Sequence, residues 1–276
     1  MKYAIINSTL ASLMKETTWD SELEDEDFYG MKVEILSQPD YEWYKVKTHY
    51  RYTGFVHVSQ LLFDEERIRI WDMSDKNVVL QPFADVLSMP KVQGHHLISL
   101  TKGAVVAILK NANEDGWVKI SLCDGKTGYM KEKFLGTYLT SYSLEKEEKL
   151  RNNIVNTALT YMGTQYRWGG KSPLGIDCSG LCAVAYMLNG VIIFRDAGIA
   201  EGFPIHEIPY EKMKPADLLF FPGHVAMYTG DGRYVHSTGK NGSDGVVINS
   251  LNSWDKDYRE DLFHKIKAVG SIFLSR

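Results

Sequence analysis

Residues 175–180, Gly175-Ile176-Asp177-Cys178-Ser179-Gly180, join a short polar turn to an apolar run. That run repeats apolar residues at helical spacing, at Leu181, Val184, Ala185 and Leu188. Asp177 is a favourable N-cap, so we expect Cys178 in the first turn of a helix. Unpaired backbone N–H groups and the helix dipole favour the thiolate there, which is the nucleophilic form. The alternative is an inert buried cysteine, because free Cys is among the most buried residue types.

Two downstream histidines favour the interpretation of Cys178 as a nucleophile over that of an inert cysteine. His224 follows Gly223 at the start of an expected strand, and His236 lies one hairpin later, after Gly230-Asp231-Gly232. Hydrolysis of an amide needs a thiolate, a base that is also an acid, and a group that orients the base. Cys178, His224 and His236 supply these in turn, with His236 in the place that a carboxylate takes in a serine triad.

Each histidine also has a structural reading, His224 as a turn residue and His236 as a half-buried strand residue. Zinc ligation by the two histidines and Cys178 is a further alternative. A cysteine at a helix start suits a nucleophile better, so we expect no metal and no cofactor.

Length, composition and charge limit the classes of function that are possible. A chain of 276 residues is long enough for two or three domains. The net charge is −4 and no basic tract occurs, which argues against nucleic acid as the main partner. No apolar run is long enough to span a bilayer. The first eight residues lack a secretory pattern, so the chain as written is expected in the cytoplasm, or in the periplasm or outside the cell if a leader was removed.

The cysteines do not form a disulfide framework. There are three of them, so they cannot all pair, and their spacing is not that of a metal site. Cys182 lies one helical turn after Cys178 and is expected to be structural, and Cys123 has no partner signal.

Three strand-like segments recur in the same order in the first half of the chain. The paired copies are residues 30–36 and 103–109, 42–46 and 116–120, and 52–56 and 126–130. This internal repeat of roughly 70 residues is the size of a domain. It resembles bacterial SH3-like barrels and predicts one barrel over 1–64 and a second over 65–138. The acidic stretch 20–27 is expected on a solvated loop, and 82–97 is expected to be an inserted loop.

The remainder, residues 139–276, predicts an α+β domain. A helix is expected from about Ser143 to Gly163, then a short aromatic strand over 164–170 and the Cys178 helix. Strand-like segments follow at 218–221, 225–228, 233–236, 246–248 and 268–274. Helices that precede antiparallel strands are typical of α+β domains, and cysteine on a helix with histidines on strands is papain-like in outline.

Residues 143–276 resemble the NlpC-type family of cell-wall cysteine endopeptidases. The resemblance rests on Tyr166-Arg167-Trp168-Gly169-Gly170, Asp177-Cys178-Ser179-Gly180, Asp217-Leu218-Leu219-Phe220-Phe221, Gly223-His224-Val225-Ala226-Met227-Tyr228 and His236-Ser237. With two SH3-like units in front, the chain is similar to γ-D-glutamyl-L-diamino-acid endopeptidases. These cleave the bond between D-glutamate and meso-diaminopimelate or lysine in peptidoglycan stem peptides.

The resemblance implies an α+β papain-like cysteine peptidase domain preceded by two all-β SH3-like barrels. The implied partners are murein peptides, L-Ala-γ-D-Glu-diamino acid, in recycling or turnover. Cys178 is then the nucleophile, His224 the base and acid, and His236 the orienting residue. Asp177 and Ser179 help to bind the free amine of an N-terminal L-alanine. Asp177 is also the helix cap, and its charge favours an ammonium group while opposing the thiolate.

Other implied contacts are less direct. Trp168 lines the substrate cleft, and Tyr166 either lines it or packs in the core. Tyr52 is the first choice for a tyrosine that the first barrel brings over the site, with Tyr44, Tyr41 or plain barrel surface as alternatives. Asp196, in Arg195-Asp196-Ala197, contributes to substrate binding. The next residues, Gly198-Ile199-Ala200-Glu201-Gly202, depart from the serine and glutamine common in the family.

Two other functions stay open on sequence alone. One is a papain-like amidase or acyltransferase acting on another amide, which the upstream barrels disfavour. The other is a non-catalytic cell-wall-binding protein, which the intact Cys178, His224 and His236 disfavour. The preferred diamino acid and the oligomeric state are not encoded in a readable pattern.

Overall fold

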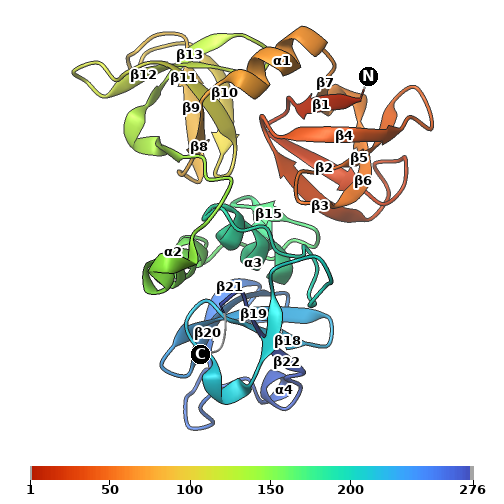
Figure 1. Cartoon of the computed structure of the whole chain (residues 1–276), viewed down its shortest axis with the longest axis vertical. Helices are drawn as coiled ribbons and strands as arrows, with labels where there is room; N and C mark the ends of the chain where they lie inside the picture. Colours follow the sequence, from red (N-terminus) through yellow and green to blue (C-terminus); the bar gives the residue numbers. More distant parts are fainter. Residues whose placement is uncertain (1, 274–276) are drawn as a thin grey trace. The chain divides into compact units, whose positions relative to one another are not determined.

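The computed structural model describes residues 2–273, and the chain divides between Tyr138 and Leu139 into two compact units (Figure 1). The first unit is built of strands apart from one α-helix and two short 3₁₀ turns, and the second combines helices with a sheet. Across residues 2–273, no helix combines the length and apolar character that crossing a membrane requires.

The first unit begins with a seven-stranded antiparallel sheet in the order β3-β2-β6-β5-β4-β1-β7. Its strands are β1 (Tyr3–Ile6), β2 (Leu10–Met14), β3 (Leu23–Phe28), β4 (Lys32–Ser37), β5 (Trp43–Lys47), β6 (Thr53–His57) and β7 (Leu61–Leu62). A 3₁₀ turn (Val58–Gln60) precedes β7. Alternate apolar residues point inward, so Ile5, Ala11, Leu13, Val33, Val46 and Val56 are buried.

A second seven-stranded sheet repeats this topology, in the order β10-β9-β13-β12-β11-β8-β14. Its strands are β8 (Lys76–Val79), β9 (Phe83–Leu87), β10 (His96–Thr101), β11 (Val105–Lys110), β12 (Trp117–Ser121), β13 (Thr127–Lys131) and β14 (Leu135–Thr137), with a 3₁₀ turn at Glu132–Phe134. The register repeats too, because Trp43 faces His57 and Trp117 faces Lys131. Helix α1 (Glu65–Met73) joins the sheets and is capped by Asp64, whose carboxylate accepts from the Arg67 N–H.

Two local expectations in this unit are wrong. Residues 23–28 of the acidic stretch form β3 rather than a solvated loop, because β2 pairs with them along its whole length. The Asp25 carboxylate accepts a hydrogen bond of 2.5 Å from the Tyr50 hydroxyl. The expected insertion over 82–97 contains β9 and the start of β10, so the loop between them is shorter than the range predicted.

The second unit carries two main helices and a six-stranded antiparallel sheet in the order β17-β22-β18-β19-β20-β21. The helices are α2 (Glu147–Leu159), α3 (Cys178–Met187) and the short α4 (Glu260–Phe263), and 3₁₀ turns lie at Leu144–Lys146 and Tyr210–Lys212. The strands are β17 (His206–Ile208), β18 (Leu218–Phe221), β19 (His224–Gly230), β20 (Arg233–Thr238), β21 (Gly245–Ser250) and β22 (Ala268–Ser271), with a two-stranded ribbon of β15 (Lys171–Ser172) and β16 (Gly175–Ile176). The end of the predicted 268–274 strand lies outside the described residues.

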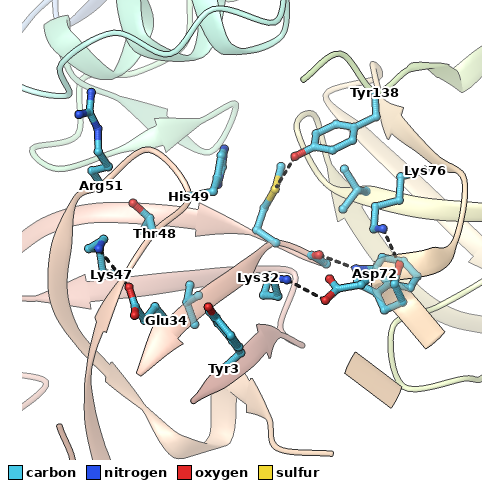
Figure 2. A pocket seen from close by; sticks show the side chains of 15 residues that line it. Tyr3, Lys32, Glu34, Lys47, Thr48, His49, Arg51, Asp72, Lys76 and Tyr138 are labelled. Atoms are coloured by element: carbon cyan, nitrogen blue, oxygen red, sulfur yellow. Dashed lines mark hydrogen bonds and ion pairs between the residues drawn. The ribbon is translucent and has the colours of Figure 1, made fainter. Parts of the chain in front are cut away.

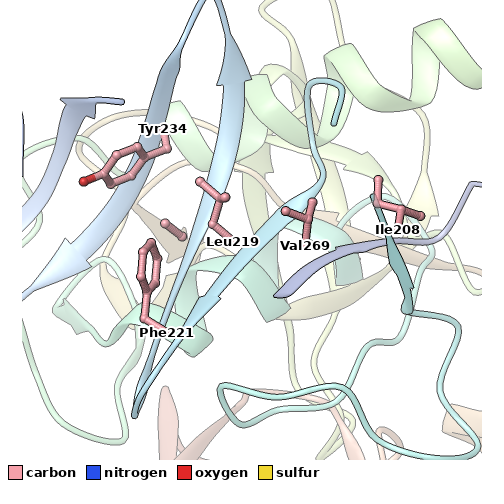
Figure 3. Close-up of a cluster of buried hydrophobic side chains, with 6 residues drawn as sticks. Ile208, Leu219, Phe221, Tyr234 and Val269 are labelled. Atoms are coloured by element: carbon pink, nitrogen blue, oxygen red, sulfur yellow. The ribbon is translucent and has the colours of Figure 1, made fainter. Parts of the chain in front are cut away.

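One face of the sheet builds a core from side chains two residues apart along the strands. Figure 3 shows this cluster, which comprises Ile208, Leu219, Phe221, Ala226, Tyr234 and Val269. Helix α3 is buried along almost its whole length and contacts β19 and β20. The contacts of α3 with β19 and β20 hold the helix beside the strands that carry both histidines.

The aromatic stretch 164–170 is not a regular strand. Gln165 and Tyr166 make isolated bridges to Gly245 and Ile176, and Gly169 then turns the chain with a φ of 70°. A positive φ at this glycine ends the extended segment before it can pair further.

Candidate active site

Helix α3 begins where its first N–H groups find a side-chain acceptor. Oδ1 of Asp177 accepts a hydrogen bond of 2.6 Å from the Gly180 N–H, and Cys178 is the first helical residue, as predicted. Gly180 is needed here, because a Cβ at this position would lie 2.2 Å from the Gly170 carbonyl oxygen. The start of the helix is thus packed directly on the backbone of the preceding turn.

Cys178 lies in an environment with opposing electrostatic effects. Its side chain is buried, with 6% exposure. Burial first, and then the Asp177 charge, raise the pKa of the Cys178 thiol to about 11, although the Val225 N–H and the Arg195 charge act in the other direction. The sequence predicted the favourable helix start, and it offered burial only as the alternative of an inert cysteine. In the free protein the sulfur therefore holds its proton at neutral pH, and the thiolate must be formed by proton transfer.

The two histidines form the middle of a hydrogen-bonded chain across three neighbouring strands. His224 Nε2 lies 2.7 Å from His236 Nδ1, and His236 Nε2 lies 2.8 Å from Asn249 Oδ1 on β21. Nδ2 of Asn249 in turn donates to the Asp257 carbonyl oxygen at 2.6 Å. Asn249 is a site residue that the sequence analysis missed, since one asparagine on a strand carries no signal of its own.

The donor and acceptor of each hydrogen bond in this series follow from its last member, the Asp257 carbonyl, because a backbone carbonyl can only accept. Nδ2 of Asn249 must donate to it, so Oδ1 of Asn249 accepts from His236 Nε2–H. His236 Nδ1 is then the acceptor for His224 Nε2–H. The lone pair of His224 is left on Nδ1, the nitrogen that does not face His236. The Val225 N–H interacts with the Cys178 sulfur, which places the start of β19 beside that sulfur.

Both imidazoles are neutral in this environment. Burial, and then the neighbouring His236, lower the pKa of His224 to about 3. Burial also lowers the pKa of His236 to about 4, with the Asn249 hydrogen bond opposing the shift. At neutral pH the site therefore contains a thiol and an unprotonated imidazole, which is the arrangement required for a base.

A buried arginine stands against the N-cap of α3. Arg195 is 2% exposed, and its two terminal nitrogens each lie 3.1 Å from a different oxygen of Asp177. It also donates to the Ser179 hydroxyl at 2.8 Å and, at 3.4 Å, to the Gly170 carbonyl. Two parallel hydrogen bonds between a guanidinium and a carboxylate fix the orientation of both side chains and hold the opposite charges together. The sequence analysis named Arg195 within a motif and did not predict this role.

The other predicted residues fall into distinct places. Trp168 is 60% exposed, and its place in a substrate cleft stays a prediction. Tyr166 is half-buried, and burial followed by the charges of Cys178 and Asp177 raises the pKa of its hydroxyl to about 12. It is therefore near the sulfur and remains a donor. Asp196 lines a small hollow together with Ser179.

Tyr52 belongs to the first unit and directly precedes β6. Its N–H donates to the Thr48 hydroxyl at 3.0 Å. Its proposed place over the site stays a prediction.

Cys182 and Cys123 are buried free thiols. Burial raises the pKa of Cys182 well above its usual value, and that of Cys123 to about 12. Within residues 2–273, no group of three or more His, Cys, Asp or Glu side chains has a metal-binding arrangement.

Known proteins resemble this chain along its whole length. A sequence profile described as the NlpC/P60 family matches residues 163–263. Dipeptidyl-peptidase 6 of Lysinibacillus sphaericus is 46% identical over 275 residues, which cover 98% of this chain and 99% of that protein. A γ-D-glutamyl-L-lysine dipeptidyl-peptidase of Bacillus cereus is 25% identical over 250 residues, 83% of this chain and 72% of the relative.

Among solved structures, an NlpC/P60 family protein from Bacillus cereus covers 97% of this chain and 98% of its own, with a TM-score of 0.78 at 20% identity. At this identity the match concerns the fold. Together with the sheets described above, it confirms the expected fold class.

Proposed function

The chain belongs to the NlpC/P60 family of cysteine peptidases, and we propose that it hydrolyses the γ-D-glutamyl–diamino acid bond of peptidoglycan stem peptides. The proposed substrates carry a free N-terminal L-alanine and meso-diaminopimelate or lysine, and the role is recycling or turnover of murein peptides. A relative named for γ-D-glutamyl-L-lysine supports the bond. The hydrogen-bonded chain from Asp257 to His224 is the observation that carries the chemistry.

In the first step His224 Nδ1 takes the proton of the Cys178 thiol, and the sulfur attacks the γ-carbonyl carbon of D-glutamate. Negative charge develops on the carbonyl oxygen, where the backbone N–H of Cys178 at the helix start donates. His224 then gives its proton to the leaving amine of the diamino acid, the C–N bond breaks, and a thioester remains on Cys178.

Water completes the reaction. His224, neutral again, takes a proton from the water that attacks the thioester. The C–S bond breaks, the thiol is re-formed, and L-Ala-D-Glu leaves. His236 keeps the ring of His224 in one tautomer and orientation through both steps, as an orienting residue does in a triad.

Recognition of the L-alanine amine is assigned to the residues around the cap. Asp177 Oδ2 accepts from Arg195, and a carboxylate oxygen can accept a second hydrogen bond from an ammonium group. Ser179 lies beside it, and Asp196 lines the adjoining hollow. Trp168 and Tyr166 are the proposed cleft residues of the second unit, and Tyr52 remains the proposed contribution of the first barrel to substrate selection.

The test is digestion of L-Ala-γ-D-Glu-L-Lys and of its meso-diaminopimelate counterpart, followed by mass spectrometry. We expect L-Ala-D-Glu and the free diamino acid from the wild-type chain. We expect none from Cys178→Ala, whose circular dichroism should match that of the wild type. A substrate with an acetylated alanine amine should be cut much more slowly. Turnover that persists in Cys178→Ala would refute the mechanism, and cleavage of non-peptide amides alone would favour an amidase.

A further inference from the structure

A cavity of about 410 Å³ lies in the first unit, where the two sheets and helix α1 meet (Figure 2). Its volume falls in the range typical of small-molecule sites, about 300–1,000 Å³. One wall comes from β4 and from the end of β5 with the turn that follows it, and the other from α1, β8 and the end of the unit. Neither barrel alone has this cavity, because each supplies only part of its wall.

The junction that forms the cavity is held by hydrogen bonds. Trp71 of α1 donates through its indole N–H to the Gly30 carbonyl at 2.8 Å, and the Val105 N–H donates to the Tyr29 carbonyl at 3.0 Å. A Cβ at Gly30 would lie 2.7 Å from Val105, and the φ of Gly30 is 81°. The barrels therefore approach as closely as backbone allows, and the cavity is a fixed feature of the unit.

The charge of the lining differs in sign from that of the whole chain. Four basic side chains line the cavity against two acidic ones, whereas the chain as a whole has a net charge of −4. The basic ones are Lys32, Lys47, Arg51 and Lys76, and the acidic ones are Glu34 and Asp72; His49 also lines the cavity. A concave surface of one sign concentrates ligands of the opposite sign.

The acidic side chains hold two of the lysines in place. Lys32 lies 2.7 Å from Asp72, and Lys47 lies 3.0 Å from Glu34. All four of these side chains keep roughly a third of their surface or more exposed. An ammonium group has three donors, so each lysine can also donate to a ligand carboxylate. Glu34 and Asp72 can in turn accept from a ligand amine.

Apolar and aromatic groups form the rest of the wall, including Tyr3, Met31, Trp71, Val105 and Tyr138. Figure 2 shows Tyr138 reaching Met31, to whose sulfur its hydroxyl donates at 3.6 Å. These groups suit the carbon skeleton of a peptide, whereas a bare inorganic anion would leave them without contacts.

We propose that this inter-barrel cavity is a second, non-catalytic binding site for short acidic peptides that carry a free amine. L-Ala-D-Glu, the acidic product of the proposed reaction, has this chemistry, so the choice of ligand rests on the proposed function. The site explains a use for two barrels in tandem, since one barrel would lack it.

The experiment is isothermal titration calorimetry of L-Ala-D-Glu into the full Cys178→Ala chain, with two double variants. Lys32→Ala/Lys47→Ala removes two charges from the cavity. Lys45→Ala/Lys119→Ala removes two charges from exposed or half-buried strand positions outside the cavity lining and serves as the matched control. Cys178→Ala keeps the proposed active-site contacts, so we expect two binding events per chain. The cavity event should weaken at least about ten-fold in the first double variant and stay unchanged in the second, because charge-assisted hydrogen bonds are lost only there.

Two further ligands test which chemical groups of the dipeptide the cavity recognises. The diamide of the dipeptide, which keeps the amine but has no carboxylate, should bind at least about ten-fold more weakly, and inorganic phosphate at the same concentration should not compete. Equal affinities in the two double variants would overturn the proposal, as would no binding of the dipeptide up to millimolar concentration. If the wild-type chain failed to hydrolyse the peptides, the proposed function would be refuted and the cavity proposal would not, because the lysine-dependent binding does not involve Cys178.

Discussion

At the scale of single residues, Asn249 decides which nitrogen of His224 can take a proton. Its amide group is oriented by the Asp257 carbonyl, and through His236 this orientation reaches the base. A His236 ring without this partner could exchange the positions of its proton and lone pair. The tautomer of His224 would then be mixed, and part of the molecules would present an N–H to the sulfur.

Replacing Asn249 with alanine should therefore lower kcat by about 10- to 100-fold, a part of the 10²–10⁴ that a general base contributes. KM should change little, since no substrate contact is removed. Steady-state kinetics with a γ-D-glutamyl peptide measures both constants, and Asn241→Ala, at an exposed position, is the control. An unchanged kcat in Asn249→Ala would mean that His236 needs no orienting partner.

The three proposed catalytic residues were readable from the sequence, and the residues that hydrogen-bond to them or to the helix cap were not. Cys178, His224 and His236 stand in short motifs with local signals: a cap, a strand start and a hairpin. Asn249 lies beside His236 only because β20 and β21 pair in one register, in which Tyr234 opposes Asn249. The packing of the whole sheet sets a register of this kind, so the residues next to Asn249 in the sequence carry no pattern that predicts it.

At the scale of elements, the N-terminus of α3 depends on a residue from outside the helix. Arg195 pairs with the cap residue Asp177 and thereby partly offsets the negative charge beside Cys178. The helix end thus receives a fixed orientation and a compensating charge from one side chain. This contact joins residues 18 positions apart across an irregular loop, which is why the sequence pattern did not predict it.

Arg195→Gln should raise the pKa of the Cys178 thiol, because the lowering contribution of Arg195 is lost while that of Asp177 remains. A higher pKa lowers the thiolate fraction, ten-fold for each unit, so alkylation of Cys178 by iodoacetamide at pH 8 should slow, by up to about ten-fold. Arg195→Lys should recover part of the rate. Mass spectrometry of the modified peptide gives the rates.

A second buried arginine of the same unit provides the control. Arg151 pairs with the buried Asp217 at 2.8 Å, in a structural role that involves none of the candidate site residues. Arg151→Gln should destabilise the unit about as much as Arg195→Gln, since both leave a buried carboxylate without its partner. It should leave the alkylation rate of Cys178 unchanged. Equal slowing in both variants would indicate general loosening rather than an effect of Arg195 on the sulfur.

At the scale of the whole molecule, the internal repeat predicted the architecture of the first unit, although two of its segments were assigned wrongly. The repeat predicted two copies of one topology, and the two sheets have the same strand order. The sequence did not indicate the cavity between them, because a cavity depends on how two surfaces meet. The boundary of the barrels at residues 64 and 65 stays a prediction.

The stability of the second unit should depend on pH through its buried histidines. The pKa of His236 is about 4 in the folded chain and about 6.5 when unfolded. Between these values the unfolded state binds more protons, so the free energy of unfolding rises with pH. The contribution of His236 is present above about pH 6.5 and is lost as the pH falls from there through 4. The slope for one such group is up to about 1.4 kcal/mol per pH unit.

His236→Asn should remove this part of the slope. Urea unfolding between pH 7 and 4.5, followed by far-UV circular dichroism, measures the free energy of unfolding at each pH. His264→Asn, at an exposed position, should keep the wild-type slope. If His236→Asn kept it as well, His236 would not be held neutral in the folded state.

The chain of hydrogen bonds that ends on the Asp257 carbonyl has one more consequence. Triads that end on an aspartate lose their anchor in acid, once that carboxylate is protonated. A main-chain carbonyl has no proton to gain in this range, so acid leaves the last link intact. Nor can replacing the Asp257 side chain delete the carbonyl itself. Apart from substitution of Asn249, displacement of the segment after β21 would disconnect it, so the conformation of that short loop is a second feature through which the proposed base can be retuned.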